Sequence, residues 1–373
     1  MSGNTVSVKA DARLARGCVL GAALGDALGA AFEFKPVAVV AERTGKTWID
    51  GLHPRITRGS AHGVWAENAP AGTGTDDTRY NWLFLELAAE LARFPSDREL
   101  ARRMLDVHDT PERFFPKRHA AIAREQFDGW RAVCHGCLGE PLPERPELPM
   151  VALRDQSMGG LNFPTLIGLI SMTCAGALIP GDPSRAYREA YLTDFQDLAY
   201  GREAVALLAA SISSAVGGNS RPRDTASPVY GLDPFALRGR FGGPFIKDRL
   251  PKLLAAVEGN QGSALAERLS RELAGFHAFD PYKTLAIAWA AVLAHPADPF
   301  DALLVAVNIR SVQADGSLGD LQDIDCYGCV TGALAGAFCG DGAFPPGMLS
   351  RVVESNKSVY GMDLEATCRR LSG

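Results

Sequence analysis

Glycine at every fourth position, in two separate apolar stretches, is the sequence feature that most restricts how this chain can fold. The first stretch covers residues 12–32 and reads as a helix, and the second follows residue 325. Their glycines are Gly17, Gly21, Gly25 and Gly29, then Gly328, Gly332, Gly336 and Gly340. Each glycine in a helix is less favourable than alanine by roughly 1 kcal/mol, so four in register need a compensating gain. Because the i, i+4 spacing places them on one face, a second helix can approach there backbone to backbone.

Most of the remaining chain also has the periodicity of helices. Helical patterns are predicted at residues 78–93, 96–107, 117–137, 165–178, 182–216 (two helices), 250–257, 263–276, 282–295 and 299–311. No stretch alternates β-branched residues over more than a few positions, so the sequence predicts an all-α fold. We expect a frayed segment at residues 1–11 and a helical domain over residues 12–373. Residues 217–234 are rich in Gly, Pro, Ser and Arg and predict a long loop.

Composition and charge exclude several classes of protein. The chain has 373 residues, of which 47% are hydrophobic, which is ample for a large core. The net charge of −5 gives no reason to expect nucleic acid or an anionic membrane as a partner. Eight dispersed cysteines and the lack of a secretory signal predict reduced thiols and a cytoplasmic location. The apolar run at residues 18–34 is too short to span a membrane and contains Asp26 and Glu33.

The loop Gly72–Thr78 contains two adjacent carboxylates, Asp76 and Asp77, directly before a long apolar run. One interpretation is a helix start, in which Thr75 or Asp76 caps the helix and acidic residues favour its first turn. The other is a cation site, because two neighbouring carboxylates stay ionised in a partly buried place only with a positive charge between them. Hydroxyl and carboxylate oxygens favour hard ions such as Mg²⁺ or Mn²⁺.

A second acidic loop, Asp323-Ile324-Asp325, precedes the second glycine-rich stretch. Two such loops far apart in sequence are less expected as unrelated caps than as parts of one site, so they favour the cation interpretation. Asp26 interrupts the first apolar stretch, either as a buried acid that caps a neighbouring backbone or as an acid at the bottom of a cleft. Glu33 follows just after that stretch.

These motifs together resemble the ADP-ribosylglycohydrolase family over about residues 12–355. The resemblance rests on Gly25-Asp26-Ala27-Leu28-Gly29 with Glu33, on Gly74-Thr75-Asp76-Asp77-Thr78, and on Asp323-Ile324-Asp325 ahead of Gly332-Ala333-Leu334-Ala335-Gly336-Ala337. It implies a compact single-domain orthogonal helical bundle with a binuclear Mg²⁺ or Mn²⁺ centre. It also implies hydrolysis of the bond between ribose C1 and its substituent, in an ADP-ribosylated protein or a smaller ADP-ribose conjugate.

The resemblance assigns roles to individual positions. Metal ligands fall on Thr75, Asp76, Asp77, Asp323, Asp325 and Cys326. The catalytic carboxylate falls on Glu33, with the ligands Asp77 and Asp323 as alternatives that the residues alone leave open. Substrate contacts fall on Asp26, Glu33, Gly159, Gly160 and Asn162.

The chain departs from the family pattern at several of these positions. Cys326 stands where the family has threonine, and a neutral thiol is a poor ligand for Mg²⁺, so one of the two ions is expected to be weakly bound or absent, or to be Mn²⁺ or Zn²⁺. Leu321 and Gln322 replace glycines before the second loop, and Asp194 replaces a histidine after Thr193. The latter change lies on the substrate side, so an N-glycosidase acting on a nucleoside, nucleotide or small molecule, and a non-catalytic ADP-ribose-binding protein, remain alternatives.

Two further patterns compete for a function. Basic residues between Arg221 and Lys252 indicate either a solvated surface or a phosphate-facing patch. The pairs Cys134 with Cys137 and Cys326 with Cys329 each have the C-x-x-C spacing of a zinc or redox site. Nearly two hundred residues separate the two pairs, which favours structural thiols.

Overall fold

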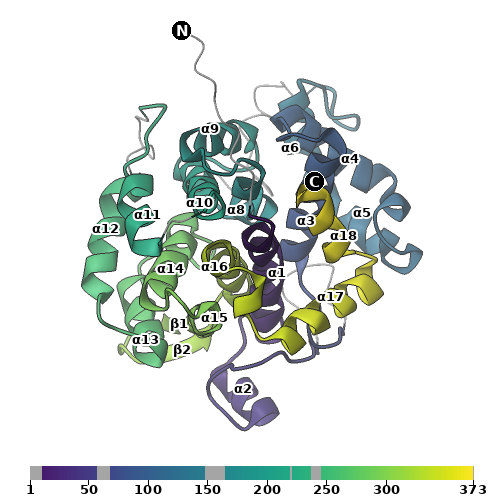
Figure 1. Cartoon of the computed structure of the whole chain (residues 1–373). Helices are drawn as coiled ribbons and strands as arrows, with labels where there is room; N and C mark the ends of the chain where they lie inside the picture. Colours follow the sequence, from purple (N-terminus) through teal and green to yellow (C-terminus); the bar gives the residue numbers. More distant parts are fainter. Residues whose placement is uncertain (1–10, 57–67, 148–163, 219–220, 237–244, 373) are drawn as a thin grey trace.

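The computed structural model describes residues 11–56, 68–147, 164–218, 221–236 and 245–372. Figure 1 shows an assembly of helices in which α1 and α16 lie side by side near the centre. The helices of the first half are α1 (Ala12–Gly29), α2 (Val37–Thr44), α3 (Asp76–Leu91), α4 (Asp97–Asp109), α5 (Ala120–Asp128), α6 (Arg131–Leu138), α8 (Ile167–Ser171) and α9 (Pro183–Thr193), with short 3-10 turns η1 (Pro111–Arg113), η2 (Lys117–His119) and η4 (Ala175–Leu178).

The second half continues in the same manner. Its helices are α10 (Tyr200–Val216), α11 (Pro222–Tyr230), α12 (Phe245–Val257), α13 (Gly262–Glu272), α14 (Pro281–Ala294), α15 (Pro299–Ala306), α16 (Ile324–Cys339), α17 (Pro346–Tyr360) and α18 (Leu364–Ser372), with the 3-10 turn η5 (Asp341–Ala343). Within the described residues the only sheet is a pair of short antiparallel strands, β1 (Arg310–Val312) and β2 (Leu318–Leu321). The all-α fold predicted from the sequence is therefore confirmed.

The two glycine-rich helices pack directly against each other along their glycine faces. A Cβ added at Gly17 would lie 2.5 Å from the Gly336 carbonyl oxygen, and one added at Gly21 would overlap the backbone of Gly332. Gly25 meets Gly328 in the same way. Such contacts require residues without a Cβ. Seven of the eight glycines lie within the two helices, and Gly340 follows the end of α16. The gain that offsets the low helix propensity of these seven is therefore backbone-to-backbone packing between α1 and α16.

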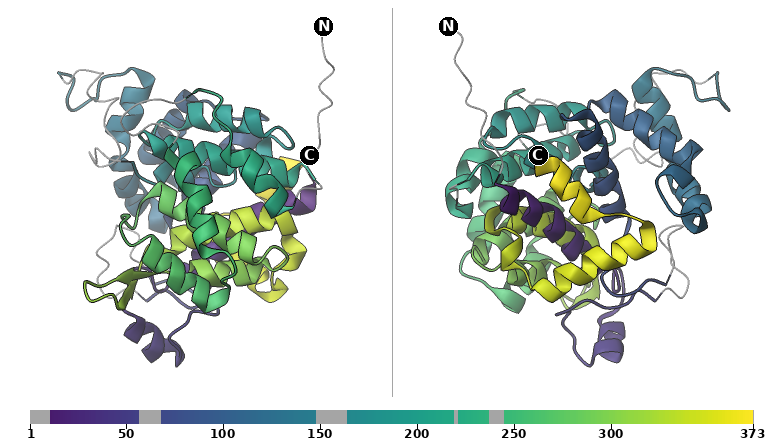
Figure 2. Two further views of the ribbon diagram at one scale, coloured as in Figure 1. Left: turned by 90° about the vertical axis from the view of Figure 1, so that its left-hand side faces the viewer. Right: turned by 45° about the vertical axis from the view of Figure 1, so that its right-hand side comes forward.

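Helices buried on nearly all sides surround this pair. In α14 every residue from Pro281 to Val292 is buried, and α10 is apolar along most of its length. Helices that are apolar all round belong in the interior of a protein. The right-hand view of Figure 2 shows the yellow helices α17 and α18 beside α1, whereas α2 stands apart from the main body. The first helix of the chain thus packs against its last two helices.

Several boundaries predicted from the sequence were wrong. The predicted loop at 217–234 contains α11, whose buried side chains recur at Pro222, Thr225, Ala226, Val229 and Tyr230. Proline is compatible with the first helical position because its missing N–H would have no partner there, so the Pro and Ser content misled the prediction.

Other predicted helices are shorter or interrupted. The helix expected at 117–137 is divided into η2, α5 and α6, and the break between α5 and α6 lies at Gly129. The stretch expected to be helical up to 178 holds only the short elements α8 and η4. The helix expected over 299–311 ends at Ala306, and its last residues enter β1. The first helix ends at Gly29 and not at residue 32. Apolar residues follow the last hydrogen-bonded turn of α1 and of α15, so the apolar pattern predicted helices that were too long.

None of the helices in the described ranges combines the length and the hydropathy that crossing a membrane requires.

Candidate metal centre

The first acidic loop opens helix α3. The Thr75 hydroxyl accepts a hydrogen bond from the backbone N–H of Asp77 at 3.4 Å, and Asp76 and Asp77 occupy the first turn. Asp77 is buried, whereas Asp76 is partly exposed. The capping interpretation is thus confirmed for Thr75. It does not compete with the cation interpretation, because the cap leaves both carboxylates available.

Asp26 lies beneath this loop and is fully buried. Its carboxylate accepts hydrogen bonds from the N–H of Thr75 at 2.8 Å, from the N–H of Thr78 at 3.0 Å and from the Thr78 hydroxyl. Desolvation raises the pKa of Asp26, and these donors oppose the rise. These contacts agree with the first interpretation of Asp26, a buried acid that caps a neighbouring backbone. They fix the shape of the first acidic loop.

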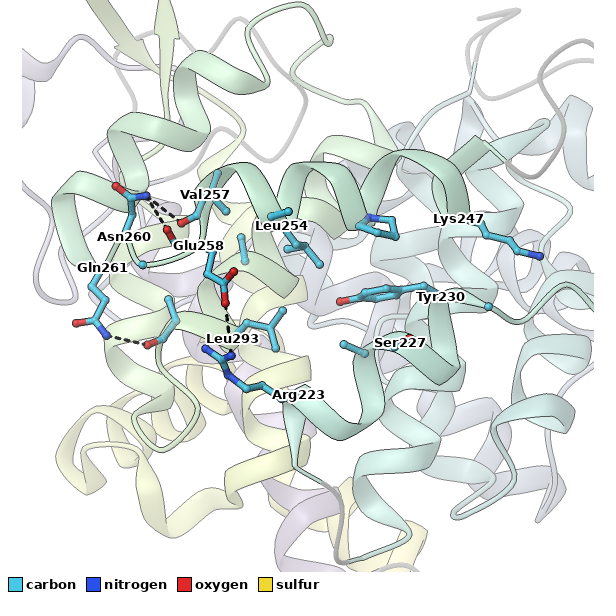
Figure 3. A pocket seen from close by; sticks show the side chains of 17 residues that line it. Arg223, Ser227, Tyr230, Lys247, Leu254, Val257, Glu258, Asn260, Gln261 and Leu293 are labelled. Carbon is cyan, nitrogen blue, oxygen red and sulfur yellow. Dashed lines mark hydrogen bonds and ion pairs between the residues drawn. The ribbon is translucent and has the colours of Figure 1, made fainter.

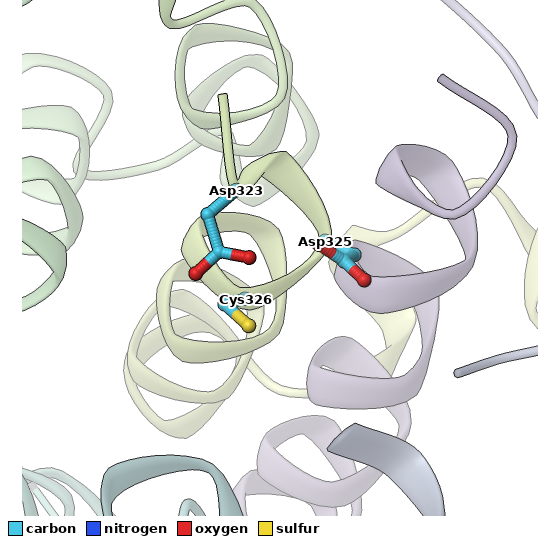
Figure 4. A group of neighbouring side chains, drawn as sticks. All are labelled: Asp323, Asp325 and Cys326. Atoms are coloured by element: carbon cyan, nitrogen blue, oxygen red, sulfur yellow. The ribbon is translucent and has the colours of Figure 1, made fainter. Parts of the chain in front are cut away.

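The second acidic loop opens helix α16. Asp323 occupies its N-cap position, and Asp325 and Cys326 follow in the first turn. One ligand atom from each of these three buried residues lies within 4.8 Å of the others (Figure 4). Among the described residues, this is the one group of three or more His, Cys, Asp or Glu side chains with that spacing.

Backbone contacts bring the end of α1 and the two loops together. A Cβ at Gly29 would lie 2.5 Å from the Cα of Asp325, so the absence of a side chain there lets the second loop approach. The turn after α1 is attached to the end of β2, since the Phe34 N–H donates to the Gln322 carbonyl at 3.1 Å. Between the loops, the Cys326 thiol donates to Asp77 Oδ1 at 3.4 Å. We call the following residues the acidic centre: Glu33, Asp76, Asp77, Asp323 and Asp325.

Burial and mutual repulsion disfavour ionisation of four carboxyl groups of the acidic centre, namely those of Glu33, Asp77, Asp323 and Asp325. Desolvation raises the pKa of Asp77, Glu33 and Asp325 well above the usual range, and neighbouring carboxylates raise each of them further. Desolvation likewise raises the pKa of Asp323 to about 8. So many carboxylates in one buried place can be ionised together only around a cation.

The donor set fits a hard divalent cation. Asp77 Oδ2, Asp323 Oδ2 and Asp325 Oδ1 are buried oxygens without a hydrogen-bond partner. A buried acceptor without a partner is unfavourable by about 1 to 3 kcal/mol, so three such oxygens in one place fit a bound cation. Mg²⁺ and Mn²⁺ prefer such oxygen donors. Cys326 is the exception, because burial raises the pKa of its thiol well above the usual range and the neutral sulfur donates to Asp77.

Helix α17 holds the first acidic loop from outside, a contribution that sequence reasoning missed. The Ser355 hydroxyl donates to the Ala71 carbonyl at 2.9 Å. The Asn356 side chain bonds both Gly72 and Gly74, and the Tyr360 hydroxyl bonds Gly74. These residues lie more than 280 positions from the loop, and no local pattern marks them. Only an alignment of co-varying positions could have suggested the contact.

Two cationic side chains near the acidic centre were also missed. Lys283 in α14 is fully buried, and its ammonium donates to Gln322 Oε1 beside Asp323. Burial lowers the pKa of Lys283 to about 8, although Asp280 and Asp323 act in the opposite direction. Arg55 donates to the Tyr360 hydroxyl at 3.0 Å, and its charge opposes the raised pKa of Glu33. The predicted substrate residues Gly159, Gly160 and Asn162 lie outside the described residues.

The basic stretch does not line the acidic centre where it is described. Arg223 and Lys247 instead border a cavity of about 600 Å³ between α11 and α12 (Figure 3). Arg223 lies 3.6 Å from Glu258, and none of the predicted site residues lines this cavity. The C-x-x-C pairs form no four-thiolate site. All eight cysteines are free, and the Cys134 sulfur contacts Met104 while Cys329 faces Thr173.

Comparison with known proteins agrees with the fold and the motifs. The sequence model of the ADP-ribosylglycohydrolase family matches residues 8–373. The structure is similar to a solved structure described as "ADP-ribosylglycohydrolase-related protein complex", with a TM-score of 0.57 and 20% identity over 97% of both chains. At that identity the likeness shows the fold alone. A search of curated proteins returned no match. Because the family match spans nearly the whole chain, this protein belongs to the ADP-ribosylglycohydrolase family, the glycosyl hydrolases of ADP-ribose conjugates.

Proposed function

We propose that this protein is a divalent-metal-dependent hydrolase that cleaves the ribosyl C1 bond of an ADP-ribosylated protein or a smaller ADP-ribose conjugate. One observation carries the proposal. Two acidic loops, about 250 residues apart, meet through the contact between Cys326 and Asp77. Three of their buried carboxylate oxygens, one each on Asp77, Asp323 and Asp325, lack a hydrogen-bond partner. Such an arrangement is unfavourable without a cation and suited to one.

The residues that would hold Mg²⁺ or Mn²⁺ are Thr75, Asp76, Asp77, Asp323, Asp325 and, at the position where the family has threonine, Cys326. Two ions are expected, with weaker binding on the side of Cys326, since its thiol is neutral and donates to Asp77. When bound, such ions orient the ribose hydroxyls and lower the pKa of a bound water.

Glu33 is the residue best placed to move a proton. Its side chain is partly exposed, as a group that contacts a substrate must be. Desolvation raises the pKa of Glu33, and the neighbouring carboxylates of Asp323 and Asp76 raise it further. Its carboxylate takes the proton of the attacking water, or stabilises the positive charge that develops on the ribose ring as the C1 bond breaks. Asp77 and Asp323 are the alternatives for this role, and Asp26 shapes the loop that carries Asp77.

The metal ligands can be tested with Asp76→Ala and Asp325→Ala. Each variant should lose roughly 100-fold or more of the rate of ADP-ribose release, because each removes an oxygen ligand. Asp97→Ala is the matched control, since Asp97 follows the N-cap Ser96 of α4 as Asp76 follows Thr75 of α3, and it should retain activity. Full activity and normal metal binding in both ligand variants would contradict the proposal.

The substrate class needs a separate experiment. We would incubate the protein with Mn²⁺ and an ADP-ribosylated protein, a small ADP-ribose conjugate, nucleosides and nucleotides, and identify the products by chromatography. Release of free ADP-ribose supports the proposal, whereas release of a free base assigns an N-glycosidase on the same fold. Calorimetric binding of ADP-ribose without any turnover at saturating Mn²⁺ would instead show a non-catalytic binding protein.

A further inference from the structure

We infer that Asn356, in helix α17, is a positioning residue of the metal centre, because its side-chain amide holds the first acidic loop in the shape that presents Asp76 and Asp77. The inference rests on the proposed function. It adds a residue far from every motif that identified the centre. Asn356 is fully buried, so its amide groups must be satisfied within the protein.

The contacts of Asn356 span both sides of Thr73. Its Oδ1 accepts from the Gly74 N–H at 3.2 Å, and its Nδ2 donates to the Gly72 carbonyl at 3.1 Å. A second bond from Nδ2 to the Val352 carbonyl, at 2.9 Å, fixes the amide on α17. One side chain thus binds a donor and an acceptor two residues apart, which fixes the direction of the loop backbone as well as its position.

The rest of the loop backbone depends on two supports. Asp26 receives the N–H of Thr75 from below, and Ser355 and Tyr360 bond the carbonyls of Ala71 and Gly74 from the side of α17. Space is also tight, because a Cβ at Gly72 would lie 2.8 Å from the Arg351 side chain. The loop is therefore held between α1 and α17, and its two carboxylates have little freedom to turn away.

Removal of this support should weaken metal binding without removing a ligand. Groups that orient metal ligands typically contribute 10- to 100-fold to metal affinity. In Asn356→Ala the carbonyl of Gly72 and the N–H of Gly74 lose their partner. We therefore expect Mn²⁺ affinity to fall about 10- to 100-fold.

Asn308→Ala is a matched control. Asn308 is also a buried asparagine that bonds loop backbone on both sides, accepting from the Ile49 N–H at 2.8 Å and donating to the Ile49 carbonyl at 2.9 Å. That loop carries no proposed ligand. Asn308→Ala should therefore lose about as much thermal stability as Asn356→Ala does. Its Mn²⁺ affinity should stay within about twofold of that of the wild type.

The experiment measures Mn²⁺ affinity by calorimetry, and amide hydrogen exchange over residues 71–78 without metal, in the wild type and both variants. Faster exchange and weaker Mn²⁺ binding in Asn356→Ala, but not in Asn308→Ala, supports the inference. Equal Mn²⁺ affinity in Asn356→Ala and the wild type overturns it and leaves the proposed function intact. A wild type that binds no Mn²⁺ overturns the proposed function and this inference together.

A milder variant covers the case in which Asn356→Ala fails to fold. Tyr360→Phe removes only the hydroxyl, which donates a hydrogen bond to the Gly74 carbonyl at 3.3 Å and accepts one from the Arg55 side chain. It should fold and lose a few-fold, roughly 3- to 10-fold, of Mn²⁺ affinity. Unchanged affinity in that variant would overturn the role of α17 in holding the loop.

Discussion

Glu203 in α10 is a buried carboxyl outside the acidic centre, and it links two helices. Its carboxylate accepts hydrogen bonds from the backbone N–H groups of Ile246 and Lys247, in the first turn of α12. Desolvation nevertheless raises its pKa to about 7, with further small contributions from Asp233 and Asp248. The folded protein therefore binds a proton at Glu203 over a range of pH in which the unfolded chain has already lost it.

This raised pKa predicts a loss of stability as pH rises. Below the unfolded pKa near 4.5 Glu203 is protonated in both states, and between 4.5 and about 7 only the folded state keeps the proton. Between pH 5 and pH 8 the wild type should lose about 2 kcal/mol of unfolding free energy relative to Glu203→Gln. Denaturant unfolding of both proteins with chelator present measures this difference. Parallel stability profiles would contradict it.

Residues differ in how far the sequence could predict their place. Thr75, Asp76 and Asp77 were predictable as the start of a helix, since a hydroxyl and two acids before an apolar run favour one, and the structure places them there. Their role as cation ligands stays a prediction. The places of Asn356, Tyr360 and Lys283 were not predictable. Each is a polar residue within a helix. The contact of Lys283 spans 39 positions of the chain, and those of Asn356 and Tyr360 span more than 280. Such contacts arise from tertiary packing, which local patterns do not encode.

At the scale of elements, the contact between α1 and α16 predicts which glycines can be replaced. Gly25→Ala places a methyl group against the Gly328 carbonyl and 2.9 Å from Leu303 Cδ2. Because both helices are buried, neither can move aside, and we expect a loss of about 3 kcal/mol or more. Thermal and denaturant unfolding measure the effect.

Gly347→Ala is the control for this substitution. Gly347 lies in the first turn of α17, and an added Cβ would meet no atom within 4 Å. Alanine there should be neutral or stabilising by up to about 1 kcal/mol, because it lowers the entropy of the unfolded chain. Equal stability of Gly25→Ala and the wild type would show that α1 and α16 do not pack as described.

Elements with a strong period were predicted well, and those with mixed composition were not. The glycine spacing of α1 and α16 and the capping box of Ser96 and Glu99 identified helices that the structure contains. Helix α11 was missed since two prolines and several polar residues resemble a loop, although its buried residues recur with helical spacing. For short elements such as α8, the surrounding packing determines the length more than local propensity does.

At the scale of the whole molecule, the acidic centre predicts that a metal ion stabilises the fold. An ion that binds only the native state stabilises it by about 2.7 kcal/mol at a concentration a hundredfold above its Kd. We therefore expect Tm to rise by a few degrees with Mn²⁺ and to return on addition of a chelator. Differential scanning calorimetry tests this. Asp76→Ala should show a smaller shift, and the same Tm with Mn²⁺ and with chelator would contradict the prediction.

The pairing of Gly25 with Gly328 also has a consequence for how the protein is made. The two glycines are 303 positions apart in the chain, yet their backbones touch. At roughly 5 to 20 residues per second, a ribosome needs about 15 to 60 s to add the partner after Gly25 has been synthesised. During that time the glycine face of α1 lacks the helix that covers it in the folded protein, so this face is exposed to chaperones and to wrong contacts until α16 has been made.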